Sequence, residues 1–353
     1  MIEQFFRSYL IAYLFWFGIA VGCLPLLMLH HLVGGTWGFV VRRILEAGTR
    51  TLPLMAAMFV PLLFGIHSLY EWSHAEVVAR DPVLQAKHAY LNTPFFIVRA
   101  AVYFIAWIVF AVVLNRWSAK QDATGDVGLV RRFQLLSAPG IIVYSLAITF
   151  ASIDWGMSLE PHWFSTIYGM LFIIGQTLAA LAFVIPVAGM LSESPPASDF
   201  MTSGVFQDLG NLLLTFVMLW AYVSFSQYLI IWSGNLPEEI PWYINRGTHG
   251  WQWIAAFLAL FHFAVPFALL LGRRNKRDKK IIGGIAIAIL VMRWVDTYWL
   301  IAPSFSRNIR LHFLDVALFL IIGGIWLNVF FNQLNKRALL PLRDPNFVLE
   351  KAA

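Results

Sequence analysis

The sequence predicts an all-α, polytopic membrane protein of about nine transmembrane helices. Three observations lead to this fold class: 59% of the 353 residues are hydrophobic, only 12% are charged, and the mean hydropathy is +0.71. Soluble domains carry about 25% charged residues. The sequence lacks the ten-residue stretches of alternating polarity that would indicate a transmembrane barrel. The segments between its apolar runs are too short to hold a globular domain.

Nine apolar segments are long enough to cross a bilayer as helices, since each crossing takes about 20 residues. In chain order they are residues 9–32, 52–70, 95–114, 138–157, 164–191, 209–232, 251–271, 281–301 and 311–331. We expect residues 9–162 to form a first four-helix bundle and residues 163–303 a second. Residues 304–353 are expected to supply one more transmembrane helix and a cytoplasmic tail.

Short motifs recur at equivalent ends of spans 2 to 4 and spans 6 to 8. Asp154 precedes Pro161 by the same seven residues that separate Asp296 from Pro303. A Tyr-x-Asn motif opens the third span, at residue 90, and another precedes the seventh, at residue 243. Parallel duplication of this kind is a known plan of membrane proteins. It is the reason for predicting two parallel bundles.

Basic residues divide unequally between the two sides of the predicted membrane. The loops after spans 1, 3, 5 and 7 share a side with the C-terminus, and together with the tail they carry 17 Lys and Arg residues, against six on the other side. Positively charged loops stay in the cytoplasm, so we expect a cytoplasmic C-terminus. The run at residues 273–280 is the strongest anchor, and it could also bind anionic lipids. We expect no nucleic-acid partner.

Three ionisable residues fall near the middle of predicted spans. Arg293 and Asp296 are three apart in span 8, so they share a helical face and can pair, and His262 is central in span 7. Such residues usually face protein or water and often mark an ion path. Two interpretations stay open: a proton relay, or a static ion pair beside a packed histidine.

Further polar residues extend this relay into a hypothetical proton path. His30 and His31 end span 1 on the predicted cytoplasmic side, where Asp208 begins span 6, and these three would form the entrance. Asp154 and Glu160, at the outer end of span 4, would form the exit. The alternatives are a histidine-rich helix terminus, which the helix dipole favours, and a solvated helix end.

A second predicted cluster lies at the outer ends of spans 2 and 4. His67 and Glu71 are four apart on one helical face, and they would join Asp154 and His162 as a polar wall facing a quinone head group. Solvation at the interface is the alternative. Farther along, His312 is followed three residues later by an acidic residue, which predicts a capped start of the last span.

The single cysteine, Cys23, lies inside the first apolar segment. One cysteine excludes a disulfide framework, a cysteine-based zinc or iron–sulfur site and a covalently attached haem. The histidines within the spans are at different depths, whereas a bis-histidine haem needs ligands at one depth on facing helices. We therefore expect no metal site and no haem or iron–sulfur centre in this chain.

Five stretches carry a family resemblance: residues 5–10 (FFRSYL), 29–38 (LHHLVGGTWG), 69–72 (LYEW), 154–166 (DWGMSLEPHWFST) and 225–235 (FSQYLIIWSGN). They resemble the quinone-binding subunit 2 of quinol:cytochrome c oxidoreductase, the bacterial alternative complex III, within the NrfD/PsrC-like superfamily. The resemblance covers nearly the whole chain. The stretch that begins at Asp154 is shared with a sister membrane subunit of that complex, whereas the second and fifth stretches favour the quinone-binding subunit 2.

The resemblance implies a scaffold and proton conduit in the bacterial inner membrane, without a redox centre of its own. Its implied partners are the sister membrane subunit, multihaem and monohaem cytochrome c subunits, an iron–sulfur subunit and membrane lipids. The quinol site is expected mainly in the sister membrane subunit, so quinone is a possible ligand here. Members of the family are expected to have ten spans, which implies that this chain begins at the second.

Two other functions fit the sequence. A stand-alone secondary transporter would also use parallel repeats and midplane charges, and it would need a discontinuous helix; Pro186 in span 5 is the one modest sign of such a break. Alternatively, the chain itself binds and oxidises quinol, with Asp154 or His67 accepting the proton.

Overall fold

A computed structural model describes residues 1–193, 195, 197–341 and 343–347. These residues contain helices, turns and irregular connections but no strand, which confirms the predicted all-α fold. Nine helices within the described part are long and apolar enough to cross a membrane, as expected, so the chain is a multi-pass integral membrane protein. Residues 194 and 196 of the second predicted bundle, and 342 and 348–353 of the final segment, lie outside the described residues.

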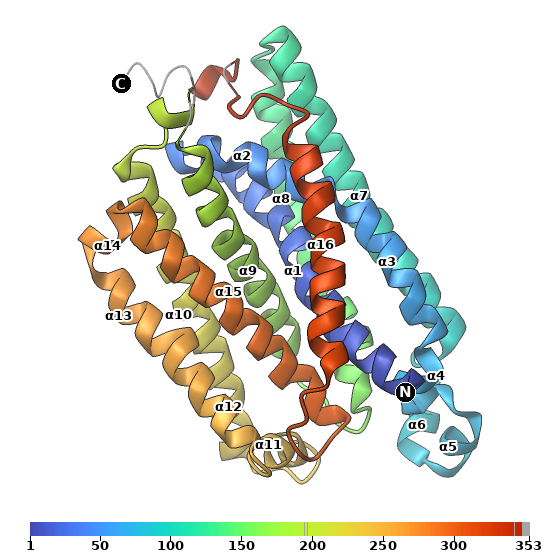
Figure 1. Cartoon of the computed structure of the whole chain (residues 1–353). Helices are drawn as coiled ribbons and strands as arrows, with labels where there is room; N and C mark the ends of the chain where they lie inside the picture. Colours follow the sequence, from blue (N-terminus) through green and yellow to red (C-terminus); the bar gives the residue numbers. More distant parts are fainter. Residues whose placement is uncertain (194, 196, 342, 348–353) are drawn as a thin grey trace.

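The helices follow one another in mostly antiparallel crossings (Figure 1). The first half contains α1 (Ile2–Val33), α2 (Thr36–Thr49), α3 (Leu52–Phe64), α4 (Ile66–Leu69), α5 (Ala75–Arg80), α6 (Pro82–Lys87), α7 (Thr93–Thr124) and α8 (Gly128–Trp155). The second half contains α9 (Tyr168–Leu191), α10 (Ser203–Gly234), α11 (Ile240–Arg246), α12 (Trp251–Leu258), α13 (Val265–Leu271), α14 (Arg273–Arg277) and α15 (Lys279–Ile301), and α16 (Phe313–Leu334) follows. A π-helical segment, Ala259–Ala264, joins α12 to α13, and short 3-10 turns occupy Glu71–Ser73, Met157–Leu159, Ala197–Asp199 and Ala302–Ser304.

Helices α1 and α9 form the centre of the molecule. They are the most enclosed of the nine spans and pack along each other. Both are apolar on all sides, as expected of helices surrounded by protein. Gly22 allows this packing, because a side chain there would collide with the backbone carbonyl of Gln176 on α9. Close approach at a small residue is the usual basis of helix association in membranes.

The remaining spans pack around this pair in two groups. In the first half α1 contacts α3 and α8, and α7 lies against both α3 and α8. In the second half α9 contacts α10 and α15, while α12 lies against α15, and α13 lies against α10 and α15. Helix α16 packs on α1 and α2. The division into two bundles at residues 162 and 303 stays a prediction.

Helix α2 differs from the sequence expectation, which placed residues 33–51 in a loop. Instead this segment is a helix of 14 residues that packs against α1, α7, α9, α10 and α16. Arg42 and Arg43 are both buried, although the charge count treated them as loop residues. The helix folds inward because its charged face meets polar groups of α7, while its apolar face meets α1.

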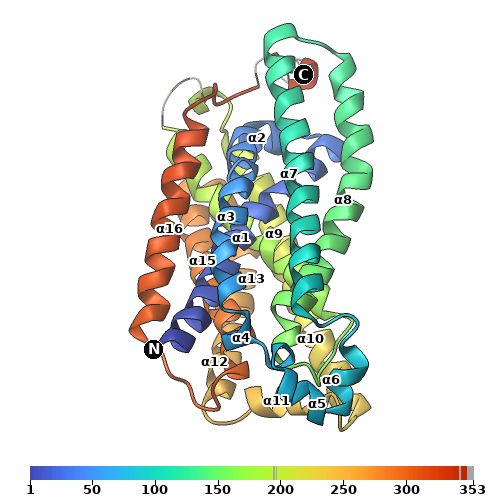
Figure 2. The same ribbon diagram turned by 90° about the vertical axis from the view of Figure 1, so that its right-hand side faces the viewer.

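The two ends of the bundle are covered by different elements (Figures 1 and 2). We call the end that holds residue 1 the N side; the short helices α4, α5, α6 and α11 lie there. The opposite end, the C side, holds α14, the turn between α7 and α8, and the tail after α16. Which side faces the cytoplasm stays a prediction.

Two local predictions concern the ends and the continuity of helices. His312 and Asp315 form a reciprocal cap at the start of α16, which confirms the predicted capped start. Ser8 of α1 donates a hydrogen bond of 2.5 Å to the same Asp315, tying the first span to the last. Pro186 lies inside the continuous helix α9. Within the described spans, irregular positions include the junction of α3 with α4 and the π-helical segment.

Candidate functional site

A charged pair lies in the middle of α15. Arg293 donates a hydrogen bond through Nη1 to Asp296 Oδ2, as their spacing of three residues predicted. Both side chains are buried. The indole Nε1 of Trp220, on α10, donates to the same carboxylate oxygen over 3.1 Å. The carboxylate of Asp296 is therefore held by the cation Arg293 on its own helix and by the indole N–H of Trp220 on the neighbouring helix α10.

His262 lies beside this pair without a hydrogen bond to it. Its ring centroid is 4.2 Å from that of Trp220, with the two rings at 70°. The imidazole is fully buried, and neither ring nitrogen has a hydrogen-bond partner among the described residues. The structure thus gathers the three residues of the predicted relay around Trp220. Proton transfer between the imidazole of His262 and the carboxylate of Asp296 would therefore need a bridging group.

The π-helical segment Ala259–Ala264 positions His262. Pro266 follows it and has no backbone N–H, so it cannot donate to the carbonyl of residue 262, and its ring crowds that carbonyl. Widening of the helix at this point relieves the clash. Such π-helical turns are frequent at functional sites. No signal in the sequence beyond Pro266 itself marks the segment.

A large cavity of about 710 Å³ lies between α10, α11, α12 and α15. Its walls are mainly apolar and aromatic, including Met218, Tyr222, Phe225, Tyr228, Phe263 and Trp299. Asp296 and Arg246 both line it, so residues with a buried carboxylate and a buried guanidinium border the same space. The volume lies in the range of small-molecule sites.

Arg246, at the end of α11, forms the N-side boundary of this cavity. It pairs with Glu160 over 2.9 Å and donates a hydrogen bond to the Leu300 carbonyl over 2.7 Å. Ser304 donates to the same Glu160 over 2.7 Å. Burial lowers the pKa of Arg246, against the opposing effect of Glu160. Glu160, predicted as part of the exit, is thereby joined to the cavity that Asp296 lines.

A small cavity of about 20 Å³ lies beside Arg293 of the charged pair, between α1, α9 and α15. Arg293 and Gln176 line it, and its size is sufficient for one water molecule. The hydroxyl of Tyr144 on α8 lies 3.5 Å from Gln176 Oε1. Polar groups therefore continue from the charged pair into the centre of the molecule.

The predicted entrance residues do not form one cluster. His30 is buried where α1 meets α2, and its ring lies against Phe39 at 4.6 Å between centroids. His31 stacks on Phe133 of α8 at 4.2 Å. Asp208 is exposed on α10 and forms no ion pair with either histidine among the described residues. The structure brings the histidines together but leaves the aspartate separate.

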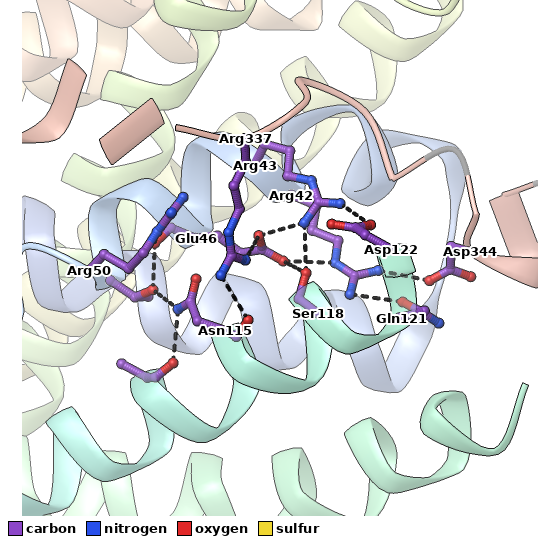
Figure 3. A network of polar contacts seen from close by, with 12 residues as sticks. Arg42, Arg43, Glu46, Arg50, Asn115, Ser118, Gln121, Asp122, Arg337 and Asp344 are labelled. Atoms are coloured by element: carbon purple, nitrogen blue, oxygen red, sulfur yellow. Dashed lines mark hydrogen bonds and ion pairs between the residues drawn. The ribbon is translucent and has the colours of Figure 1, made fainter. Parts of the chain in front are cut away.

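A network that sequence reasoning missed lies next to these histidines, on the C side of the molecule (Figure 3). Glu46 of α2 is fully buried and accepts hydrogen bonds from Arg42 over 3.0 Å and Arg43 over 2.8 Å. Ser118 of α7 donates to the same carboxylate over 2.6 Å. The three charged residues are four or three apart on one helix, and this spacing was the signal that could have revealed their pairing.

The same network reaches the tail that follows α16. Arg42 pairs with Asp344 over 2.7 Å, and Arg43 pairs with Asp122 of α7 over 2.5 Å. Arg337 approaches Glu46 at 3.4 Å. Figure 3 shows these side chains converging from α2, α7 and the tail. Segments far apart in the sequence are thus fastened together by charge on the C side.

Asp154 is fully buried at the end of α8, where a solvated helix end was the alternative prediction. Arg99 of α7 holds it through two hydrogen bonds of 2.8 Å each, and the Tyr103 hydroxyl donates to it over 2.8 Å. Arg99 also stacks over the ring of Tyr90 at 3.8 Å. The matched aspartates 154 and 296 are therefore both bound by an arginine.

The other members of the predicted outer cluster lie apart from Asp154. His67 is exposed, with its ring centroid 3.7 Å from that of His74, and Glu71 is exposed as well. His162 is also exposed and pairs with Asp81 over 2.6 Å. Desolvation acts to raise the pKa of Asp81, but this hydrogen bond and two from the backbone outweigh it and lower the pKa.

No group of three or more His, Cys, Asp or Glu side chains that could hold a metal ion is present in the part of the chain that the structure describes. A scan against protein-family models finds no match, and a search of curated proteins finds none either. The family resemblance therefore remains an expectation from the sequence.

Proposed function

We propose that this protein is a membrane subunit of a quinol:cytochrome c, or other acceptor, oxidoreductase of the alternative complex III type. Within that complex it serves as a scaffold and a proton conduit rather than as the electron-carrying subunit. The sequence resemblance supports the choice of complex. The arrangement of charges inside the membrane helices supports the conduit.

The observation that carries the proposal is the position of the Arg293–Asp296 pair between two cavities. Arg293 lines the small cavity beside Gln176, and Asp296 lines the large one. An ionisable residue in a transmembrane helix usually faces protein or water and often belongs to a proton relay. Here the carboxylate of Asp296 can exchange a proton with the large cavity, while Arg293 keeps its charge and joins the pair to the small one.

The proposed path runs from the C side to the N side. His30 and His31 form the proposed entrance, with Asp208 as a separate proton-accepting group on the surface of α10, while His262, Arg293 and Asp296 form the relay. Glu160 is the proposed exit because its partner Arg246 lines the cavity that Asp296 faces. Asp154 is held in a separate pair with Arg99, and we assign it to a second exit.

The proposal includes location and partners. We place the protein in a bacterial inner membrane with its C side in the cytoplasm, in contact with the sister membrane subunit, multihaem and monohaem cytochromes c and an iron–sulfur protein. Electrons pass through those partners, and this chain needs no covalently bound cofactor.

Purification from native membranes tests the assembly. The chain is tagged at its C-terminus and solubilised in mild detergent. We expect multihaem cytochrome c and an iron–sulfur protein to co-purify with it, and mass spectrometry and haem absorbance identify them. Recovery of a stable, monodisperse chain alone would refute the complex and favour a transporter.

Asp296→Asn in the assembled complex tests the conduit. The asparagine oxygen can still accept from Trp220 and Arg293, but the side chain cannot carry a proton. Fewer protons released per quinol oxidised, with all subunits still present, is the expected result. Asp126→Asn, on an exposed turn, is the control. Unchanged proton stoichiometry in an intact Asp296→Asn complex would rule the relay out.

A further inference from the structure

A short segment of the tail, residues 343–347, lies on the C side of the bundle next to α2. Asp344 is buried there and accepts a hydrogen bond from Nη1 of Arg42 over 2.7 Å (Figure 3). Arg343 donates to the carbonyl of Ala123, at the end of α7, over 2.7 Å. Two side chains thus fasten the segment to α2 and α7.

The end of this segment completes a small apolar cluster that is separate from the main core. Phe347 lies against Phe39 of α2 and Phe200 of the connection before α10, with ring centroids 5.6 Å and 4.9 Å apart, and Leu340 is buried with them. A satellite cluster of this size buries little apolar surface, so a segment held by it opens more readily than the core does. The segment can therefore detach while the bundle stays folded.

Detachment would not leave an unmatched charge inside the protein. Arg42 keeps Glu46 as a second carboxylate partner at 3.0 Å and also donates to Gln121 over 3.1 Å. Asp344 would move into water, where its carboxylate is solvated. Breaking a buried ion pair is costly mainly because it strands one charge, so the pair of Arg42 with Asp344 is suited to open reversibly.

Each histidine of the predicted entrance is one aromatic ring away from this segment or its partner. His30, which is 2% exposed, lies edge-on to Phe39, and Phe39 also contacts the end of the segment. His31 stacks on Phe133, and the guanidinium of Arg42 lies over that ring at 4.9 Å. Departure of the segment would remove the cover from Phe39 and one carboxylate from Arg42.

We propose that residues 343–347 are a strap that closes access to His30 from the C side, with Asp344 and Phe347 as its latch. Detachment of the strap frees Phe39 and lets water reach the imidazole of His30, whose Nδ1 has no hydrogen-bond partner among the described residues. Order–disorder changes of a segment are a recurrent form of molecular switch. The role of the strap as a gate for protons rests on the proposed conduit, whereas access to His30 is measured on the isolated chain, so the two proposals can fail separately.

Chemical labelling of the purified chain in detergent micelles tests the strap. Diethyl pyrocarbonate modifies accessible neutral imidazoles, and peptide mass spectrometry gives the rate at His30. Exposed His88 is the reference for unhindered reaction, and buried His262 reports whether the fold is intact. The backbone N–H of Asn346 donates to Asp344 Oδ1 over 3.0 Å, so hydrogen–deuterium exchange at that amide measures detachment of the strap itself.

In wild type, His30 is expected to react more slowly than His88, by a factor similar to the protection of the Asn346 amide, because one opening exposes both. Asp344→Asn loses a charge-assisted hydrogen bond, so labelling of His30 and exchange of the strap should both become about tenfold faster. Phe347→Ala should also accelerate both. Phe347→Leu, which keeps an apolar side chain, should have a smaller effect.

Asp126→Asn is the matched control, because Asp126 also accepts from the backbone N–H two residues later but forms no ion pair among the described residues. Phe331→Ala, on the exposed face of α16, is the control for the aromatic substitution. Both should keep the wild-type rate at His30. A variant that is labelled at His262 has lost its fold, and wild type and the remaining variants then decide.

Three results would overturn the proposal. Equal rates at His30 and His88 in wild type would show that nothing covers the histidine. Rapid exchange at Asn346 beside an unreactive His30 would show that the strap opens without exposing it. Labelling of His30 that is the same in folded strap variants and in the controls would show that the latch does not govern access.

Discussion

Three buried carboxylates in the membrane helices, those of Glu46, Asp154 and Asp296, are each bound by arginine. Arginine suits this role because its planar fork donates several hydrogen bonds and keeps its charge. The partner of Asp296 could be predicted, since both residues share one helix. The partner of Asp154 could not, because Arg99 lies on α7 and the pairing depends on how α7 and α8 pack. Sequence spacing therefore reveals pairs within helices and misses pairs between them.

Removing the charge of Glu46 is expected to destabilise the protein more than any surface change. In Glu46→Gln the side chains of Arg42 and Arg43 stay buried but lose their shared carboxylate. Removal of one partner from a buried ion pair costs about 3–5 kcal/mol. Thermal unfolding in detergent micelles gives the difference from wild type. Glu238→Gln, on an exposed loop, is the control, and equal stability of the two variants would contradict the structural role of the network.

At the scale of elements, α2 is a helix that the pattern of apolar residues does not predict. The nine spans could be predicted because each contains a long apolar run. Helix α2 contains Arg42, Arg43 and Glu46 within a short segment, so it resembles a solvated loop until its partners on α7 and in the tail are known. The helix is stable inside the protein because those partners satisfy its charges.

The contact between α1 and α9 gives an element-scale prediction. Gly22→Ala would place a methyl group against the Gln176 carbonyl and is expected to push the helices apart, at a cost of about 1–3 kcal/mol. Gly324→Ala enters open space on α16, so its expected effect is a gain within about 1 kcal/mol from helix propensity. Unfolding of both variants in micelles is the measurement. Equal effects would show that the α1–α9 contact is not tight.

The matched aspartates of the two halves are held by arginines in different ways. Arg99 reaches across from α7 to Asp154, whereas Asp296 pairs with Arg293 on its own helix, α15. The repeat therefore preserves the carboxylate but not the position of its partner.

For the whole molecule, the sequence predicted the class and the number of spans, but the side of the membrane rests on charge counting alone. That count included Arg42 and Arg43, which are buried. Without them the loops on the C side still carry the larger share of basic residues, chiefly at positions 273–280. The predicted orientation therefore survives this revision and needs a direct measurement.

Single-cysteine labelling measures the orientation. Cys23 is the one cysteine in the sequence and is buried, so Cys23→Ala provides a clean background. In right-side-out spheroplasts, Val77→Cys on α5 is expected to react with a membrane-impermeant maleimide. Arg277→Cys on α14 should react only after the membrane is permeabilised. The opposite pattern would invert the topology and reverse the direction of the proposed proton path.

The ion pair between Arg42 and Asp344 also constrains biosynthesis. Arg42 lies on α2, directly after the first span, whereas its partner Asp344 follows α16, so the ribosome has delivered all nine described membrane helices before this pair can form. Until then an arginine destined for the interior lacks one of its two carboxylate partners. A nascent chain released early would keep that charge incompletely matched. Membrane quality-control proteases would then have a marker that separates unfinished chains from finished ones.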